Sequence, residues 1–185
     1  MRATGIVRRI DELGRVVIPK EIRRTLRIRE GDPLEIYTEN NGEVVLKKYS
    51  PIGEISQIAR DYSDSLYRSL GHWACICDRD AVVSVSGGMK KDYLQKPLSQ
   101  EVESAMQARQ TLRLSSQDGS RMLPLTRDDD PSAYTAQSLI PVVADGEVIG
   151  ALMLISRENA ARISDTDMKV AETTASLIGR QMEAN

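Results

Sequence analysis

Short runs of apolar residues, separated by turn-forming residues, fill positions 1–50 of the chain. Residues 3–11 (ATGIVRRID) and 14–19 (GRVVIP) are rich in β-branched side chains, which predicts two strands around a turn. Pro19 suits the first turn of a helix that would continue through residues 20–26. Residues 33–49 predict a hairpin, because the Asn-Gly pair near their middle is a strong turn signal. This segment is therefore expected to be mainly β, with one short helix.

The segment carries too little apolar surface to form a core by itself. In the first predicted strand, Ile6 and Ile10 lie on one face and Val7 lies on the other. Domains of roughly fifty residues are marginally stable when they fold alone. Strands from a second copy would cover both faces, so we expect an obligate, interleaved homodimer.

A helix is expected after Ser50-Pro51, since Ser is a good N-cap and Pro suits the first helical position. Its apolar residues recur at spacings of three and four, the a and d positions of two heptads: Ile52, Ile55, Ala59, Tyr62 and Leu66. This stripe could be an oligomerisation seam between chains, or the face of a helix that lies on its own domain. Two heptads are fewer than the three or four that identify a coiled coil, so both interpretations stay open.

Residues 72–185 alternate predicted strands and helices, which indicates an α/β domain. Two hairpins are expected, over residues 73–87 and 133–156, because turn-forming residues divide each of these stretches. One helix is expected over residues 97–112. The last helix should begin at Ser164, which has an acidic residue three positions later and so resembles a capping box.

These patterns divide the chain into two domains and a connection. We expect a mainly-β domain at residues 1–51 and, at residues 52–71, a connecting helix that either joins chains or lies on its own domain. An α/β domain with an antiparallel sheet and flanking helices should follow at residues 72–185.

Charge is distributed unevenly along the chain. Residues 1–29 hold nine Lys or Arg and three Asp or Glu, a net charge of +6, although the whole chain carries −2. The remaining residues therefore carry −8. A basic segment joined to an acidic one is a candidate binder of polyanions.

The basic residues of this segment are mostly arginines. Arg8 and Arg9 lie on a predicted strand, Arg15 follows the turn, and Arg23 and Arg24 lie on the predicted helix. A run of charge is usually only a solvated face. Arginine, however, suits bidentate contact with phosphates and with guanine edges, and a compact fold would bring the three elements together. A homodimer would give this surface the two-fold symmetry of duplex DNA. The pattern therefore favours double-stranded DNA as partner.

Catalytic and metal-binding patterns are missing from the sequence. It contains no P-loop, HExxH, GxSxG or GxGxxG motif. His72 is the only histidine, and the spacing of Cys75 and Cys77 matches neither a CxxC redox motif nor a zinc knuckle. No stretch approaches the roughly 18 apolar residues of a membrane span, and no leader peptide is recognisable. We expect a cytoplasmic protein that is not an enzyme and uses no cofactor or metal.

Residues 3–51 closely resemble the swapped-hairpin DNA-binding domain of AbrB-type bacterial transition-state regulators. The resemblance covers ATGIVRRIDELGRVVIPKEIRRTLRI and the hairpin that follows it. It implies an intertwined dimer, whose DNA-contacting arginines correspond to Arg8, Arg15, Arg23 and Arg24, with a further basic contact at Arg9.

The segments ICDRD, SGGMKKDYL and GRQME resemble the sporulation regulators of that family, whose carboxy-terminal domain is GAF-like. The resemblance implies a bacterial transcription regulator of sporulation genes, assembled as a tetramer. It leaves open whether the GAF-like domain senses a small-molecule effector or only joins chains, and the residues that would bind a ligand are unknown. The alternative is an antitoxin, since toxin-neutralising proteins share the swapped-hairpin domain. Antitoxins usually carry a short disordered tail, whereas a long patterned α/β region follows here.

Overall fold

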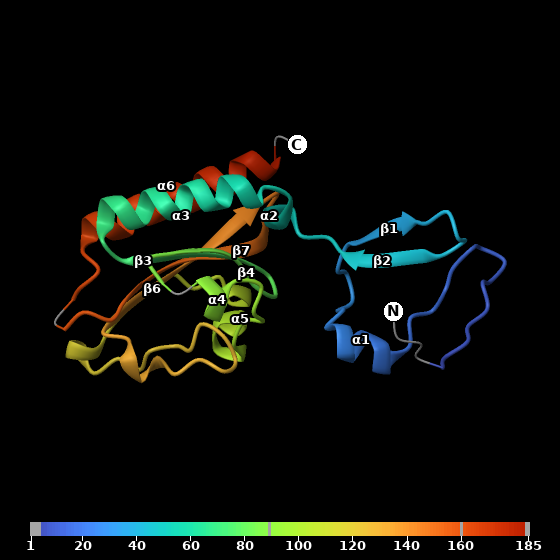
Figure 1. Cartoon of the computed structure of the whole chain (residues 1–185), viewed down its shortest axis with the longest axis horizontal. Helices are drawn as coiled ribbons and strands as arrows, with labels where there is room; N and C mark the ends of the chain where they lie inside the picture. Colours follow the sequence, from blue (N-terminus) through green and yellow to red (C-terminus); the bar gives the residue numbers. More distant parts are fainter. Residues whose placement is uncertain (1–4, 89, 160, 184–185) are drawn as a thin grey trace. The chain divides into compact units, whose positions relative to one another are not determined.

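A computed structural model describes residues 5–88, 90–159 and 161–183 of the chain. The chain divides into two compact units, residues 1–49 (unit 1) and residues 50–185 (unit 2), and each is described by itself (Figure 1). The expected pair of domains is therefore present. Residues 52–71, which we treated as a connection, belong to unit 2.

Unit 1 contains helix α1 (Lys20–Leu26) and a hairpin of strands β1 (Leu34–Thr38) and β2 (Val44–Lys48). The hairpin confirms the prediction from the Asn-Gly pair, and Gly42 adopts the left-handed conformation (φ +82°) that this turn requires. Helix α1 confirms the prediction of a helix over residues 20–26, with Pro19 at its N-cap instead of inside its first turn.

The two strands expected over residues 3–11 and 14–19 are not formed. Residues 5–10 and 15–18 run without regular strand pairing on either side of a tight turn; Ala3 and Thr4 lie outside the described residues. In the turn, the Gly14 amide donates to the Asp11 carbonyl (2.9 Å). A strand needs a regular ladder of hydrogen bonds with a neighbouring strand, and no such ladder forms at residues 5–10 and 15–18.

Unit 1 has almost no interior. Of residues 5–49, Pro19 alone is buried, while Val7, Val17 and Ile36 are 87%, 72% and 66% exposed. The two apolar side chains of α1 are also exposed to solvent in part, since Ile22 is half-buried and Leu26 is 56% exposed. Exposed apolar patches of this kind mark an interaction surface.

Unit 2 is built on an antiparallel sheet of five strands in the order β4-β3-β7-β6-β5. The strands are β3 (Trp73–Asp78), β4 (Val82–Ser86), β5 (Leu112–Ser115), β6 (Ala136–Ala144) and β7 (Glu147–Ser156). Both predicted hairpins are confirmed. The turn between β6 and β7 places Asp145 and Gly146 at positive φ (49° and 74°), as a type I′ turn demands.

The helix expected over residues 97–112 is shorter than predicted. Helix α5 (Gln100–Gln107) begins at the Ser99 cap, and the chain turns through Arg109 in the left-handed conformation (φ 54°). Leu112–Ser115 then form β5, which pairs with the start of β6 at the edge of the sheet. The prediction was wrong here because a four-residue strand carries too few positions to show a period.

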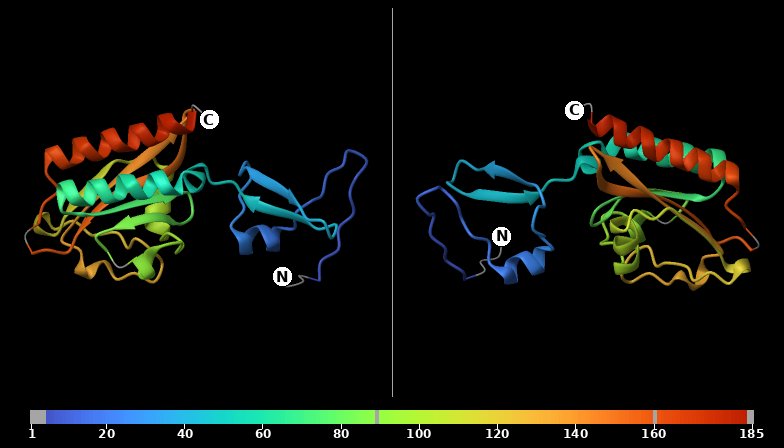
Figure 2. Two further views of the ribbon diagram at one scale, coloured as in Figure 1. Left: turned by 45° about the horizontal axis from the view of Figure 1, so that its top comes forward. Right: turned by 180° about the vertical axis from the view of Figure 1, so that it is seen from behind.

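Helices cover both faces of this sheet (Figures 1 and 2). Helices α2 (Pro51–Glu54), α3 (Ser56–Leu70) and α6 (Asp165–Glu183) lie on one face, with α3 and α6 side by side. Helices α4 (Lys90–Tyr93) and α5 lie on the other, with the 3-10 turns Ser116–Asp118 and Pro131–Ala133 in the loops. The capping box of α6 is confirmed, since the Ser164 hydroxyl accepts from the Asp167 amide (3.1 Å) and the Asp167 carboxylate accepts from the Ser164 amide (2.7 Å).

The heptad stripe lies against the sheet of its own unit. Ile52, Ala59 and Leu66 are 0%, 0% and 4% exposed, and Ile55 and Tyr62 pack partly buried against the same cluster. Side chains enclosed by their own chain cannot form a seam between chains. The oligomerisation assignment is therefore corrected for Ile52, Ala59 and Leu66, and the second interpretation of the stripe holds for them. The helix is also interrupted at Ile55, which ends α2 and precedes α3.

Candidate nucleic-acid interface

The five arginines singled out by the sequence fall into two groups in unit 1. Arg8 and Arg9 precede the turn at residues 11–14, Arg15 follows it, and Arg23 and Arg24 occupy consecutive positions of α1. Four are exposed and Arg23 is half-buried. Among the described residues, no hydrogen bond or ion pair joins the two groups.

The turn at residues 11–14 is organised by the Asp11 carboxylate. Its Oδ1 accepts from the amides of Leu13 (3.0 Å) and Arg15 (2.8 Å), while its Oδ2 accepts from Arg15 Nε (2.8 Å). The amide and then the guanidinium of Arg15 hold the pKa of Asp11 below its usual range. Sequence reasoning treated this turn only as a corner and missed Asp11. The signal available was an Asp at the first position of a turn, four residues before an Arg.

The end of α1 is fixed to the hairpin by Lys48. Its ammonium donates to the Arg27 carbonyl (3.0 Å) and pairs with Asp32 (3.3 Å). Arg27 is the C-cap in the left-handed conformation, so the lysine satisfies a carbonyl at the end of the helix. These contacts set the position of the arginines of α1 relative to β2.

The sheet face beneath α4 and α5 in unit 2 is filled by the chain's own side chains. A buried cluster there includes Cys75, Cys77, Leu139 and Met153, each at most 1% exposed. Burial raises the pKa of Cys75 to about 12 and that of Cys77 well above its usual value, which disfavours the reactive thiolate form of both side chains.

A polar network closes one edge of this cluster. The Tyr134 hydroxyl donates to Asp129 Oδ2 (2.5 Å), and Tyr93 lies within 3.2 Å of Asp129 Oδ1 and 3.3 Å of the Tyr134 hydroxyl. Burial first, and then the bonded carboxylate, raise the pKa of Tyr134 far above its ordinary range. Arg157 lies over the rings of Trp73 and Tyr134, at 5.1 and 5.8 Å from their centroids. These contacts make the network part of the packing.

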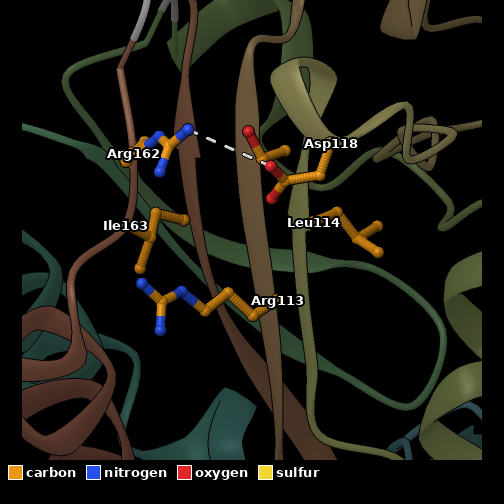
Figure 3. A pocket seen from close by; sticks show the side chains of 6 residues that line it. Arg113, Leu114, Asp118, Arg162 and Ile163 are labelled. Atoms are coloured by element: carbon orange, nitrogen blue, oxygen red, sulfur yellow. Dashed lines mark ion pairs between the residues drawn. The ribbon is translucent and has the colours of Figure 1, made fainter.

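A small cavity of about 270 Å³ lies beside the edge strand β5 (Figure 3). It is lined by Arg113, Leu114, Ser115, Asp118, Arg162 and Ile163. Arg162 Nε donates to Gln117 (2.7 Å), and its Nη2 lies 4.0 Å from Asp118. Arg113 pairs with Asp165 at the start of α6. Both guanidiniums thus have partners within the chain, and we assign no effector to this cavity.

Neither a metal-binding cluster nor a membrane-spanning helix occurs in the part of the chain that the structure describes. No group of three or more His, Cys, Asp or Glu residues in it could hold a metal ion. Its helices include none with the length and apolar content needed to cross a bilayer.

Comparisons with known proteins agree with this division into two units. A family model described as "Stage V sporulation protein T C-terminal, transcription factor" matches residues 54–183, and one described as "Antidote-toxin recognition MazE, bacterial antitoxin" matches residues 7–54. Stage V sporulation protein T of Bacillus subtilis (strain 168) is 52% identical over 183 residues, which span 99% of both chains. The transition state regulatory protein AbrB of the same organism is 51% identical over 71 residues, 38% of this chain and 72% of that one.

Solved structures show the fold of unit 2. The GAF domain of an Acinetobacter phosphoenolpyruvate-protein phosphotransferase superposes with a TM-score of 0.58 at 12% identity, covering 75% of this chain and 85% of that one. Residues 122 to 287 of a methyl-accepting chemotaxis protein also give 0.58, at 17% identity over 71% and 92% of the two chains. Both resemblances in the sequence, to AbrB-type and to GAF-like domains, are confirmed.

An AbrB-like amino-terminal domain joined to a GAF-like domain defines a class of bacterial transcription factors. The chain belongs to the family of stage V sporulation protein T. The antitoxin model matches only residues 7–54, whereas the sporulation regulator matches almost the whole chain, so the regulator is favoured over the antitoxin.

Proposed function

We propose that the chain regulates transcription of sporulation genes by binding double-stranded DNA through Arg8, Arg9, Arg15, Arg23 and Arg24 of an intertwined homodimer. The observation that carries this proposal is that unit 1 leaves its apolar side chains exposed while it presents these arginines. Residues 5–10 and 15–18 have the composition of strands but form no regular strand here, which supports strand formation with a second copy that would cover the exposed apolar residues. The same pairing would bring the two groups of arginines to one two-fold symmetric surface. A cytoplasmic location and the absence of catalysis are part of the same proposal.

Unit 2 is proposed to join two such dimers into a tetramer. Ile58 of α3 is 38% exposed, and Val170 and Leu177 of α6 are 37% and 46% exposed. Helices α3 and α6 lie side by side, so their outer sides form a surface suited to a helix bundle with a second copy. The filled sheet face beneath α4 and α5 supports assembly over the sensing of a small-molecule effector.

The test of DNA binding uses the full chain and fluorescent duplexes enriched from a random-sequence pool by the wild type. Arg8→Ala, Arg15→Ala and Arg24→Ala should each weaken binding about tenfold or more, because hydrogen bonds to charged groups contribute about 1.5–3 kcal/mol. Arg121→Ala removes an exposed charge of unit 2 and is the matched control, expected to bind as the wild type does. Light scattering should show the same mass for all variants. Enrichment of no sequence by the wild type, or unchanged binding in all three variants, would refute the proposal.

A further inference from the structure

The ion pair between Asp11 and Arg15 places a carboxylate inside the proposed DNA surface. Duplex DNA carries one negative charge per roughly 1.7 Å of helix axis, so a carboxylate there opposes binding. The side chains of Asp11 and Arg15 remain 41% and 70% exposed, so the pair stands open to a ligand. Because the Asp11 carboxylate repels the phosphates, we expect it to favour DNA binding in some other way.

The geometry of the pair suggests that role. Asp11 Oδ2 holds Nε of Arg15 at 2.8 Å, and the part of the chain that the structure describes offers Nη1 and Nη2 no partner. A carboxylate bound at Nε occupies the side edge of the planar guanidinium, and the end edge formed by Nη1 and Nη2 stays available to a ligand. Two parallel donors in one plane match the O6 and N7 acceptors of guanine in the major groove.

The contact is local, because the two residues lie four positions apart on one turn. The same carboxylate also accepts the Leu13 and Arg15 amides through Oδ1, so its position is fixed by the backbone of the turn. Pairing of unit 1 with a second copy therefore does not have to create this arrangement. A guanidinium held at fixed geometry loses less freedom when it binds a base edge than a mobile guanidinium does. A mobile guanidinium would bind the nearest phosphate instead.

We infer that Asp11 is a specificity-determining positioning residue, which holds the Arg15 guanidinium for bidentate contact with a guanine. This inference rests on the proposed DNA binding and adds a division of labour among the arginines. Arg15 reads a base, while the negative charge of Asp11 weakens the general electrostatic attraction of the surface to DNA. The alternative is that Asp11 serves only the turn.

Asp11→Asn separates these two roles. The amide side chain keeps a carbonyl oxygen to accept the Leu13 and Arg15 N–H groups, and so keeps the turn. It replaces the charged acceptor of Arg15 Nε by an NH2 group, which cannot accept a hydrogen bond. The variant should therefore fold and associate as the wild type does, with Arg15 released.

The experiment measures binding of the full chain to two duplexes of equal length. One is enriched from a random pool by the wild type, and the other is alternating A·T sequence, which contains no guanine. We expect guanine in the enriched duplex. Asp11→Asn should weaken binding to it by about tenfold, within the discrimination that one bidentate base contact provides. Its affinity for the A·T duplex should stay equal or rise, with a salt slope steeper by up to about 0.9 for each phosphate newly contacted.

A double-mutant cycle completes the test. In the Arg15→Ala background, Asp11→Asn should no longer change the ratio of the two affinities. The inference is overturned if the enriched duplexes lack guanine, if Asp11→Asn shifts both affinities by the same factor, or if its effect on the ratio persists without Arg15. Failure of the wild type to bind either duplex would instead remove the proposed function, and the inference with it. Normal wild-type binding with an unchanged ratio in Asp11→Asn would remove the inference alone.

Discussion

Replacing Ile52 by alanine should destabilise unit 2 at every protein concentration. Ile52 is fully buried, and a Cβ added at Gly150 would lie 2.5 Å from its Cδ1, so the side chain sits tightly against β7. Truncation of a buried isoleucine to alanine costs about 2–5 kcal/mol, from lost burial and the cavity left behind. With a urea dependence of about 2 kcal/mol per molar, a loss of about 3 kcal/mol lowers the unfolding midpoint by about 1.5 M.

The assay is urea unfolding of the full chain, followed by the fluorescence of Trp73, the only tryptophan, which lies on β3 of unit 2. Ile58→Ala is the matched control, because Ile58 is also an isoleucine of this helical segment but is 38% exposed. Ile58→Ala should lower the free energy of unfolding of unit 2 by less than about 1 kcal/mol, and its main effect should be weaker assembly of the chains. If Ile52→Ala lowers the free energy of unfolding as little as the control does, the burial of Ile52 is contradicted. The burial is also contradicted if the effect of Ile52→Ala vanishes at high protein concentration, because stabilisation by a seam between chains depends on concentration.

Two further predictions concern buried and titrating groups of unit 2. Cys75 and Cys77 should resist iodoacetamide at pH 8 in the native protein and react in urea, because burial raises the pKa of both thiols; native labelling would contradict the packing. Burial raises the pKa of Asp167, but the amide and hydroxyl of Ser164 together with His72 outweigh burial and lower it. Its contribution to stability is therefore present above the ordinary carboxyl pKa of about 4 and is lost as the pH falls through the lower folded value. Asp167→Asn should flatten the decline in the urea midpoint below about pH 4, and an unchanged decline would contradict this assignment.

Much of the fold could be predicted because its signals are local. The Asn-Gly and Asp-Gly turns define two hairpins, and the reciprocal bonds between Ser164 and Asp167 define the start of α6. Such features depend on a few neighbouring residues, so the sequence displays them directly.

The remaining elements depend on distant or missing partners. Strand β5 forms because Leu112–Ser115 meet β6, which follows them only after a long irregular stretch. Residues 5–10 and 15–18 have strand-like composition but form no regular strand in this chain. The stripe from Ile52 to Leu66 has the spacing of a coiled coil and equally that of a helix on a sheet, and only the packing distinguishes the two.

The candidate site was predictable in its chemistry but not in its geometry. Charge and residue type pointed to Arg8, Arg9, Arg15, Arg23 and Arg24, and which positions contact DNA came from the family resemblance. The net charge of residues 1–29 does not reveal the role of Asp11. This residue lowers the positive charge of the segment, yet its carboxylate orients Arg15. A residue that acts through another one is visible only once the contact between them is known.

The central claim is that the arginines of unit 1 bind DNA, and the salt dependence of binding tests it most directly. The logarithm of the association constant of the full chain should fall linearly with the logarithm of salt concentration, with a slope of about −0.9 for each phosphate neutralised. The triple variant Arg8→Ala, Arg15→Ala and Arg24→Ala should bind far more weakly and with a shallower slope. Binding that does not depend on salt, or a triple variant with the affinity and slope of the wild type, would contradict the claim.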